Sequence, residues 1–148
     1  IRSLMPDAFI GIDVITGFPG ETEENFQETY DLLARLKPSF LHIFPFSERP
    51  GTPAVTMPHK VQSRIATERV ERLESLSQRL YKSFAEKYLG TTRSVLFEST
   101  DHSGQMFGYT DNYLRVTHPY DTKLINTIVN VRLLSLDDEG NIGSEIVG

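Results

Sequence analysis

The sequence predicts an α/β unit followed by a small all-β barrel, and three observations support this fold class. Residues 8–46 have the pattern strand, helix, strand with short connections, which is typical of a right-handed parallel crossover. Residues 60–89 contain neither glycine nor proline and repeat apolar side chains at helical spacing. After Gly90 the apolar spacing becomes that of short strands separated by Gly, Asp and Asn. We therefore expect two domains, 1–90 and 91–148.

The first strand is expected at residues 8–16 (AFIGIDVIT), a β-branched and mostly apolar run that suits a strand buried in a parallel sheet. The turn GFPG at 17–20 ends this strand. Thr22 can cap the next helix, and the glutamates around it complement the partial positive charge of a helix N-terminus. Apolar side chains at helical spacing extend the helix to Leu36, where a Lys-Pro pair stops it. A second strand follows at 40–46.

The middle of the chain is expected to form a loop and then a long helix. Residues 47–59 contain three of the eight prolines and little periodicity, so they predict an ordered loop. Residues 60–89 predict one amphipathic helix that ends at Gly90. Its polar face is expected to carry a row of charged side chains, namely Arg64, Glu68, Arg69, Arg72, Glu74, Arg79 and Lys82.

The last part of the chain predicts a small closed antiparallel barrel, because closure removes the exposed edges of a sheet made of short strands. The sequence contains no internal repeat and no low-complexity stretch. The strands are expected at 94–99, 106–109, 113–117 and 127–136, and 145–147 begins or completes a fifth.

The composition is that of a folded globular protein, with 148 residues of which 39% are apolar. No run approaches the roughly 18 consecutive apolar residues of a membrane-spanning helix, and residues 1–7 lack the order of a secretory leader. We therefore expect a cytoplasmic protein without a membrane partner. The absence of cysteine excludes disulfides and cysteine-ligated metals or clusters within the chain, and the four histidines lack the close spacing of a metal site.

The charge distribution argues against a strong non-specific hold on nucleic acid. The formal net charge is −5, and residues 91–148 contain 4 basic against 8 acidic side chains. RNA binding by the second part alone is therefore expected to be weak.

Candidate site residues of the first part fall near the ends of the two predicted strands, where parallel sheets and barrels bind ligands. The turn at 17–20 can present amides of a helix N-terminus to a ligand, or can simply connect two elements. Asp13 either faces a polar site or reaches solvent or an arginine, because a carboxylate inside an apolar strand is costly unless paired. Arg49, in the proline-rich loop, can pair with a carboxylate or phosphate or remain a surface side chain.

The second part offers a different kind of candidate. The segment GYTDNYLRV interleaves Tyr109 and Tyr113 with polar residues and Arg115. Aromatic side chains on a small barrel can stack on unpaired bases, with a cation beside them for phosphate. The alternative is a hairpin whose tyrosines complete the core, and the spacing does not decide between the two.

Three segments together resemble the radical-SAM methylthiotransferases. They are GIDVITGFPGETEENFQETY, FPFSERPGTPA and GYTDNYLRV, and they occur in the order of that family across nearly the whole chain. The segment GYTDNYL is most similar to the corresponding segment of the branch that acts on threonylcarbamoyladenosine in tRNA. The resemblance implies the C-terminal part of a radical-SAM barrel, which is TIM-like, followed by an RNA-binding TRAM domain with an OB-like barrel.

The resemblance also implies an activity and its cofactors. The parent enzyme would replace a C–H bond of the hypermodified adenosine beside the anticodon with a methylthio group, using S-adenosylmethionine and two 4Fe-4S clusters. The implied cofactor-binding residues are Ile15, Gly17, Phe18, Pro19, Gly20, Phe44, Pro45, Phe46 and Ser47. The implied substrate-binding residues are Asp13 and Arg49 in the barrel part and Tyr109, Tyr113 and Arg115 in the TRAM-like part, with the tRNA anticodon stem-loop as partner.

The chain departs from the family pattern because the cysteines that bind the clusters are absent from it. We therefore expect no catalytic residue, metal or bound cofactor in this chain, and no activity from it alone. A truncated barrel should expose an apolar sheet face, through which we expect self-association. The alternative function is a non-catalytic RNA-binding adaptor in which the long helix serves as a spacer.

Overall fold

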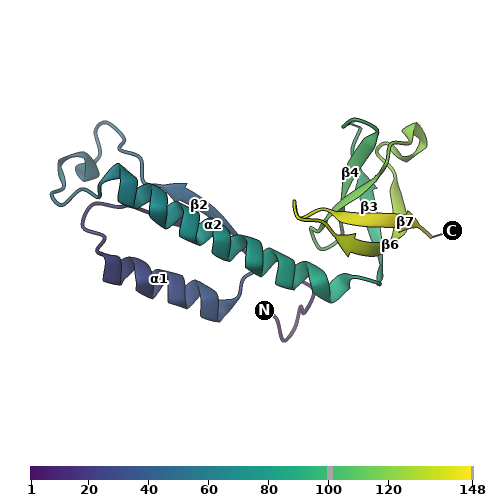
Figure 1. Cartoon of the computed structure of the whole chain (residues 1–148), viewed down its shortest axis with the longest axis horizontal. Helices are drawn as coiled ribbons and strands as arrows, with labels where there is room; N and C mark the ends of the chain where they lie inside the picture. Colours follow the sequence, from purple (N-terminus) through teal and green to yellow (C-terminus); the bar gives the residue numbers. More distant parts are fainter. Residues whose placement is uncertain (100–101, 148) are drawn as a thin grey trace. The chain divides into compact units, whose positions relative to one another are not determined.

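The computed structural model describes residues 1–99 and 102–147, and the chain divides into two compact units (Figure 1). One unit is Ile10–Leu80, and the other combines Ile1–Phe9 with the residues from Tyr81 onward. No helix in the described ranges is both long and apolar enough to cross a bilayer. In chain order, with 3-10 turns labelled η, the elements are β1 (Gly11–Thr16), α1 (Glu23–Leu36), β2 (Phe40–Pro45), η1 (Pro53–Thr56), α2 (Ser63–Ala85), η2 (Glu86–Tyr88), β3 (Thr92–Phe97), β4 (Gln105–Thr110), β5 (Arg115–Pro119), η3 (Thr122–Leu124), β6 (Ile128–Leu136) and β7 (Ile142–Ile146).

The predicted strand, helix and strand are present, and β1 pairs with β2 in parallel. The helix between them begins where the sequence places its cap. The Asn25 amide donates to the Thr22 hydroxyl at 3.2 Å, and the Thr22 amide donates to the Asn25 side-chain oxygen at 3.1 Å. Lys37 ends α1 in the left-handed region, with φ 50, and its amide donates to the Leu33 carbonyl.

The two-stranded sheet is covered on one face only, which corrects the expectation of a strand buried on both faces. Ile12 and Val14 pack against the core, whereas the alternate residues of β1 are exposed. Both helices contribute to the core of this one face, so the opposite face has no covering element in this unit. The buried core residues are Phe26, Leu33, Leu41, Leu73, Leu76 and Leu80.

The free edge of β2 is occupied by a side chain of α2. The Leu41 amide donates to the Ser77 hydroxyl oxygen at 3.0 Å, and the Ser77 hydroxyl donates back to the Leu41 carbonyl at 3.3 Å. Ser77 is buried, so these two bonds satisfy backbone groups that would otherwise lie unpaired in an apolar setting. They terminate the sheet at this position.

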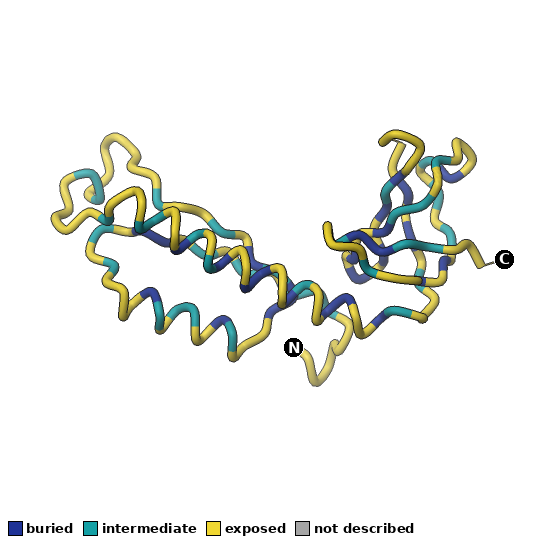
Figure 2. The backbone as a smooth tube through the Cα atoms, in the orientation of Figure 1, coloured by how far each residue is buried: buried dark blue, intermediate teal, exposed yellow. Residues whose placement is uncertain are grey.

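The long predicted helix is confirmed with tighter bounds, and buried residues recur along one side of it (Figure 2). One member of the predicted polar face is wrong: Arg69 is only 3% exposed. It is buried because it forms an ion pair with Glu21, at 2.6 Å from Nη1 to Oε2. Arg72 also pairs across to the other helix, with Glu23 at 2.6 Å, instead of with its own helical neighbour Glu68.

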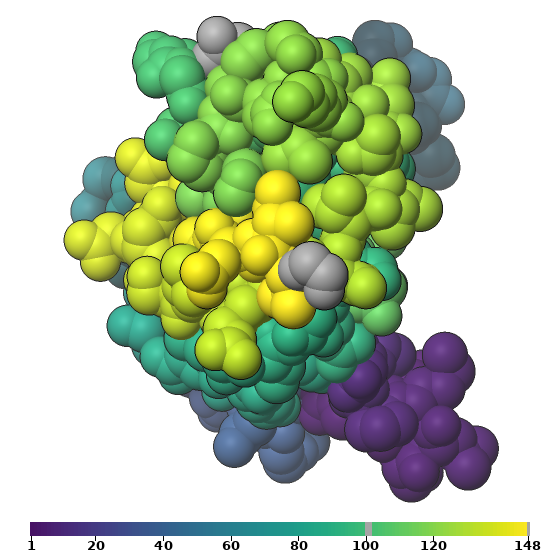
Figure 3. Space-filling view, turned by 90° about the vertical axis from the view of Figure 1, so that its right-hand side faces the viewer, coloured from purple at the N-terminus to yellow at the C-terminus, as the bar shows by residue number. Residues whose placement is uncertain are grey.

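The predicted closed barrel is present, with the strand order β3-β4-β5-β7-β6 around the ring. Its antiparallel character is corrected at one pair, because β5 and β7 run parallel. A ring of five strands cannot alternate direction at every neighbour, since strict alternation needs an even number. Figure 3 shows the yellow C-terminal residues lying among green residues of earlier strands, as the placement of β7 between β5 and β6 requires.

The interior of the barrel is filled by apolar side chains that alternate with outward residues along β3, β4 and the first part of β6. Its strands and adjoining turns contribute Val95, Phe97, Met106, Leu114, Val116, Leu124, Val131, Leu133 and Ile142. Gly108 lies at the tightest point of this packing. A Cβ on Gly108 would meet the Leu96 carbonyl oxygen at 2.6 Å and Val95 Cγ1 at 2.7 Å.

The Gly108→Ala substitution is therefore expected to destabilise the barrel by about 1–3 kcal/mol, because backbone and core atoms must move to admit one methyl group. Gly143→Ala is the matched control: it also lies in a barrel strand, and its Cβ would have ordinary contacts at 3.8 Å or more. The control should leave stability unchanged or raise it by about 0.5–1 kcal/mol. Urea unfolding followed by circular dichroism measures both, and equal stabilities would contradict the packing argument.

Candidate functional sites

The turn after β1 and the loop after β2 leave the sheet at the same edge, as the sequence predicts. Because the strands are parallel, their carboxyl ends meet, with Thr16 opposite Pro45 in the register. The Phe46 amide donates to the Thr16 carbonyl at 2.8 Å, and the rings of Phe18 and Phe46 pack edge to face at 5.0 Å. The Gly20 amide donates to the His59 carbonyl at 2.9 Å, which ties the turn to the far end of the loop.

The open face of the sheet brings three predicted site residues together. Asp13 and Ile15 of β1 and Phe44 of β2 all lie on this face, and Ile15 is directly opposite Phe44. The side chains of Ile15 and Phe44 form an exposed apolar pair, with exposed fractions of 60% and 50%. Asp13 lies two residues before Ile15 in β1, opposite His42, and adds an exposed carboxylate to the same face. Such a surface can receive a flat heteroaromatic group with a polar substituent beside it.

The remaining predicted residues of this unit lie in the loop. Ser47 and Arg49 are exposed, and the backbone at Arg49 is ordered by a local turn. The Arg49 carbonyl accepts from the Thr52 amide at 3.2 Å and from the Thr52 hydroxyl at 2.8 Å. Gly51, with φ +83, supplies the left-handed conformation that this turn requires. Two hydrogen bonds to its carbonyl therefore fix the backbone that carries the exposed Arg49 side chain.

A cavity of about 480 Å³ lies along β2 on the side of α2. It is lined by backbone and side chains of Phe40 to Phe44 together with Glu74, Ser77 and Gln78. Phe44 is the one predicted site residue on its wall. Since neither the turn at 17–20 nor the loop at 47–52 reaches it, we assign the candidate cofactor site to the carboxyl ends of the strands, where the predicted residues gather.

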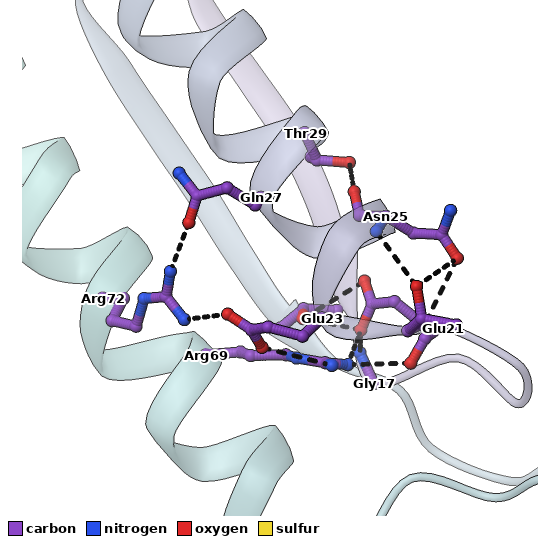
Figure 4. Close-up of polar contacts among 10 residues, drawn as sticks. Gly17, Glu21, Glu23, Asn25, Gln27, Thr29, Arg69 and Arg72 are labelled. Carbon is purple, nitrogen blue, oxygen red and sulfur yellow. Dashed lines mark hydrogen bonds and ion pairs between the residues drawn. The ribbon is translucent and has the colours of Figure 1, made fainter.

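Two residues that organise the turn, Glu21 and Arg69, are not among the site residues predicted from the sequence. Glu21 accepts from the Gly17 amide at 2.6 Å and from the Thr16 hydroxyl at 3.1 Å, and Arg69 reaches it from α2 (Figure 4). The sequence contains a signal for this: position 69 continues the spacing of the buried Leu73, Leu76 and Leu80, so an arginine there falls on the apolar stripe. A charged residue on such a stripe indicates a buried partner.

Surface contacts flank this buried pair. Arg72 donates to Glu23 at 2.6 Å and to the Gln27 side-chain oxygen at 2.7 Å, and its guanidinium lies 4.5 Å from the ring centre of Phe26. The hydrogen bond from Arg72 lowers the pKa of Glu23. These contacts join α2 to α1, whereas Arg69 joins α2 to the turn.

In the barrel unit, the two predicted tyrosines lie on the outer surface. Tyr109 is 40% exposed and Tyr113 69% exposed, so the alternative that they complete the core is wrong. Their ring centres are 6.0 Å apart. Arg115 of β5 lies opposite Tyr109 of β4, and its guanidinium stacks at 4.1 Å from the ring centre of Phe107. Aromatic rings and one cation therefore share a continuous outer face of the barrel.

Tyr113 is held outward by a strained turn and not by the predicted strand, which begins at Arg115. Its φ is 64, a left-handed conformation that costs a non-glycine residue about 1–2 kcal/mol. The Tyr113 amide donates to the Thr110 carbonyl at 3.0 Å, and the Leu114 amide donates to the Thr110 hydroxyl oxygen at 2.8 Å. The buried Asn112 accepts from that hydroxyl at 2.7 Å. Strain at an exposed aromatic residue makes its presentation a hypothesis of function.

A second arginine in this unit is already engaged. Arg93 forms ion pairs with Asp7 at 2.6 Å and with Asp111 at 3.3 Å, and it lies 4.7 Å from the ring centre of Tyr88. The hydrogen bond from Arg93 holds the pKa of Asp7 below its usual range. Because carboxylates neutralise Arg93, Arg115 is the cation beside the exposed tyrosines. Across the described parts of the chain, no group of three histidine or acidic side chains is placed to hold a metal ion.

Comparison with known proteins shows which family the chain resembles. Residues 86–139 match the TRAM domain family, so the barrel unit contains a TRAM domain. The chain is 40% identical over 138 residues to the threonylcarbamoyladenosine tRNA methylthiotransferase MtaB of Bacillus subtilis (strain 168), covering 90% of the chain and 31% of that protein. It is 39% identical over 135 residues to the tRNA-2-methylthio-N(6)-dimethylallyladenosine synthase of Symbiobacterium thermophilum, covering 90% and 29%. MtaB of Thermotoga maritima is 36% identical over 142 residues, covering 96% and 32%.

The chain therefore belongs to the tRNA methylthiotransferases, as a C-terminal part that carries the TRAM domain. This confirms the family expected from the three sequence segments. The chain spans about 31% of the length of the relatives that it matches.

Replacement of Tyr113 by glycine tests the strain at the exposed turn. Tyr113→Gly should be more stable than Tyr113→Ala by about 1 kcal/mol, because both variants lose the ring but only glycine adopts positive φ without steric cost. Thermal unfolding of the two variants measures the difference. Equal melting temperatures would show that Tyr113 is not strained.

Proposed function

We propose that the protein containing this chain is a radical-SAM enzyme that converts N6-threonylcarbamoyladenosine, beside the tRNA anticodon, to its 2-methylthio form. The observation that carries the proposal is the open sheet face at the carboxyl ends of β1 and β2. A glycine turn, an apolar pair and the Arg49 loop gather there, in the chain segments that resemble the family. In this proposal β1 and β2 are the last two strands of an α/β barrel, and their open face lines its interior.

S-adenosylmethionine fits the residues present. Ile15 and Phe44 offer an apolar surface to its adenine, and the turn at 17–20 offers backbone groups at close approach because two of its residues are glycines. When bound, S-adenosylmethionine and the iron–sulfur clusters supply the radical and sulfur chemistry. This chain has no cysteine, so the ligands of both clusters must come from other parts of the protein. We therefore propose that the chain alone is inactive.

Each unit contains residues that we propose for substrate binding. We assign Asp13 and Arg49 to substrate binding, because Asp13 is an exposed carboxylate on the open sheet face and Arg49 is exposed in the loop that follows β2. The TRAM domain would bind the anticodon stem-loop through Tyr109, Tyr113 and Arg115, whose rings can stack on unpaired bases. We propose a cytoplasmic location, which a tRNA substrate would support. The same open face, uncovered in this chain, would lead the isolated chain to self-associate.

The choice of threonylcarbamoyladenosine is supported by the segment GYTDNYL and by the 40% identity to MtaB of Bacillus subtilis. Relatives at 39% identity are named for the dimethylallyl-modified adenosine, so the two substrates need a direct test. Expression of the full-length protein in a bacterium that lacks both enzymes should restore 2-methylthio-N6-threonylcarbamoyladenosine in tRNA nucleosides measured by mass spectrometry. Restoration of the dimethylallyl product instead would assign the protein to the other branch.

Removal of both exposed rings tests the RNA surface. In the full-length protein, Tyr109→Ala with Tyr113→Ala should weaken tRNA binding by about 30-fold or more, since base stacking contributes roughly 1–3 kcal/mol per base and both rings are lost. Fluorescence anisotropy with labelled tRNA measures the affinity. The matched control is Tyr109→Phe with Tyr113→Phe, which keeps both rings and should bind within about threefold of wild type. Unchanged affinity in the alanine variant would remove these residues from the interface.

A further inference from the structure

Glu21 and Arg69 form an ion pair that is almost completely enclosed within its unit. Their side chains are 14% and 4% exposed, and Nη1 of Arg69 lies 2.6 Å from Oε2 of Glu21. The same Oε2 accepts from the Gly17 amide at 2.6 Å, and Arg69 Nη1 also donates to the Glu21 carbonyl oxygen at 3.2 Å. One carboxylate and one guanidinium therefore fix both ends of the turn at 17–20 (Figure 4).

The turn depends on these bonds because its own residues constrain it little. Gly17 and Gly20 have φ of +85 and +89, in a region that glycine enters and leaves freely. A Cβ on Gly20 would meet nothing within 4 Å, so packing does not hold the backbone there. Gly17 is closer packed, with a Cβ position 3.1 Å from Ala66 of α2. The hydrogen bonds to Glu21 therefore act together with the bond from the Gly20 amide to the His59 carbonyl to select one conformation among several that the sequence permits.

Stability alone does not account for an ion pair in this position. Burial removes both charges from water, and the cost of this often exceeds what the pair returns compared with apolar residues of similar volume. Arg69 is also incompletely satisfied by protein groups, since its buried Nε has no hydrogen-bond partner among the described residues. What the pair does supply is a fixed orientation of the two side chains, because a guanidinium and a carboxylate interact in a defined geometry.

We propose that Glu21 and Arg69 are positioning residues for S-adenosylmethionine: the pair holds the turn at 17–20 in the conformation that receives the cofactor. This inference rests on the proposed function, which places the cofactor against that turn. Arg69 lies on α2 and faces the turn through Glu21, so it acts without touching the cofactor. The pair links the cofactor site to the packing of α2 against the sheet.

The test uses the full-length protein with Arg69→Met, which keeps the volume of the side chain and removes its charge. We expect the KM for S-adenosylmethionine to rise about tenfold, as loss of an outer-shell partner does at other sites, with kcat changed less than about twofold. Amide hydrogen exchange of peptides covering 16–20, measured by mass spectrometry, should become faster because Glu21 is no longer fixed. Arg69→Lys should recover part of the affinity, since one ammonium can still reach Glu21.

Two variants serve as matched controls. Arg72→Met makes the same change one helical turn further along α2, and Glu23→Gln removes the exposed carboxylate that also contacts Arg69. Both alter contacts to α1 and leave the Glu21 contact in place, so both should keep the wild-type KM and exchange rate. If either control raised the KM as much as Arg69→Met does, the effect would be general to the helix packing and the proposal would be overturned.

The outcomes separate this proposal from the function on which it rests. Wild-type protein that neither binds S-adenosylmethionine nor modifies tRNA would remove the proposed function, and this proposal with it. Active wild-type protein with an unchanged KM and exchange rate in Arg69→Met would overturn the positioning role alone. If Arg69→Met lowers the melting temperature, the double variant Glu21→Gln with Arg69→Met is used, because it leaves no unpaired charge. A double variant that melts like wild type but binds the cofactor weakly supports the proposal, and one that binds normally overturns it.

Discussion

The parallel pairing of β1 with β2 is the constraint on which the candidate cofactor site depends. It brings the turn after one strand and the loop after the other to a single edge, so that residues about thirty positions apart, such as Ile15 and Phe44, become neighbours. The two helices then cover one face and leave the other open. An antiparallel pairing of the same strands would separate the turn from the loop, and the glycines, the aromatic contact and the arginine would not share a surface.

Local signals in the sequence were sufficient for most of the fold. The cap at Thr22, the apolar spacing along α2 and the change of period after Gly90 each act over a few residues, and each structure they predict is present. Features set by distant residues could not be predicted in this way. The burial of Arg69 depends on Glu21, 48 positions earlier, and the parallel contact of β5 with β7 follows from closing a ring with an odd number of strands.

The candidate sites show the same division. Residue chemistry selected Asp13 and the resemblance selected Ile15 and Phe44, and the alternation of β1 and β2 places all three on one face. The outward position of the barrel tyrosines could not be read from spacing, because a two-residue period fits either face of a strand. The left-handed backbone at Tyr113 depends on a buried asparagine and a threonine hydroxyl that fix the turn around it. If the barrel binds RNA as proposed, its acidic charge and exposed aromatic rings favour stacking on bases over charge contacts with phosphates.

The pair of hydrogen bonds between Ser77 and Leu41 determines at which edge of the sheet a further strand can pair. Backbone groups at the margin of β2 are already engaged there, so an incoming strand cannot continue the ladder on that side without displacing a buried hydroxyl. Among the described residues, no side chain forms equivalent hydrogen bonds with the free edge of β1. In the proposed α/β barrel, further strands would therefore be added beyond β1, because Ser77 blocks strand pairing at Leu41 on the opposite margin.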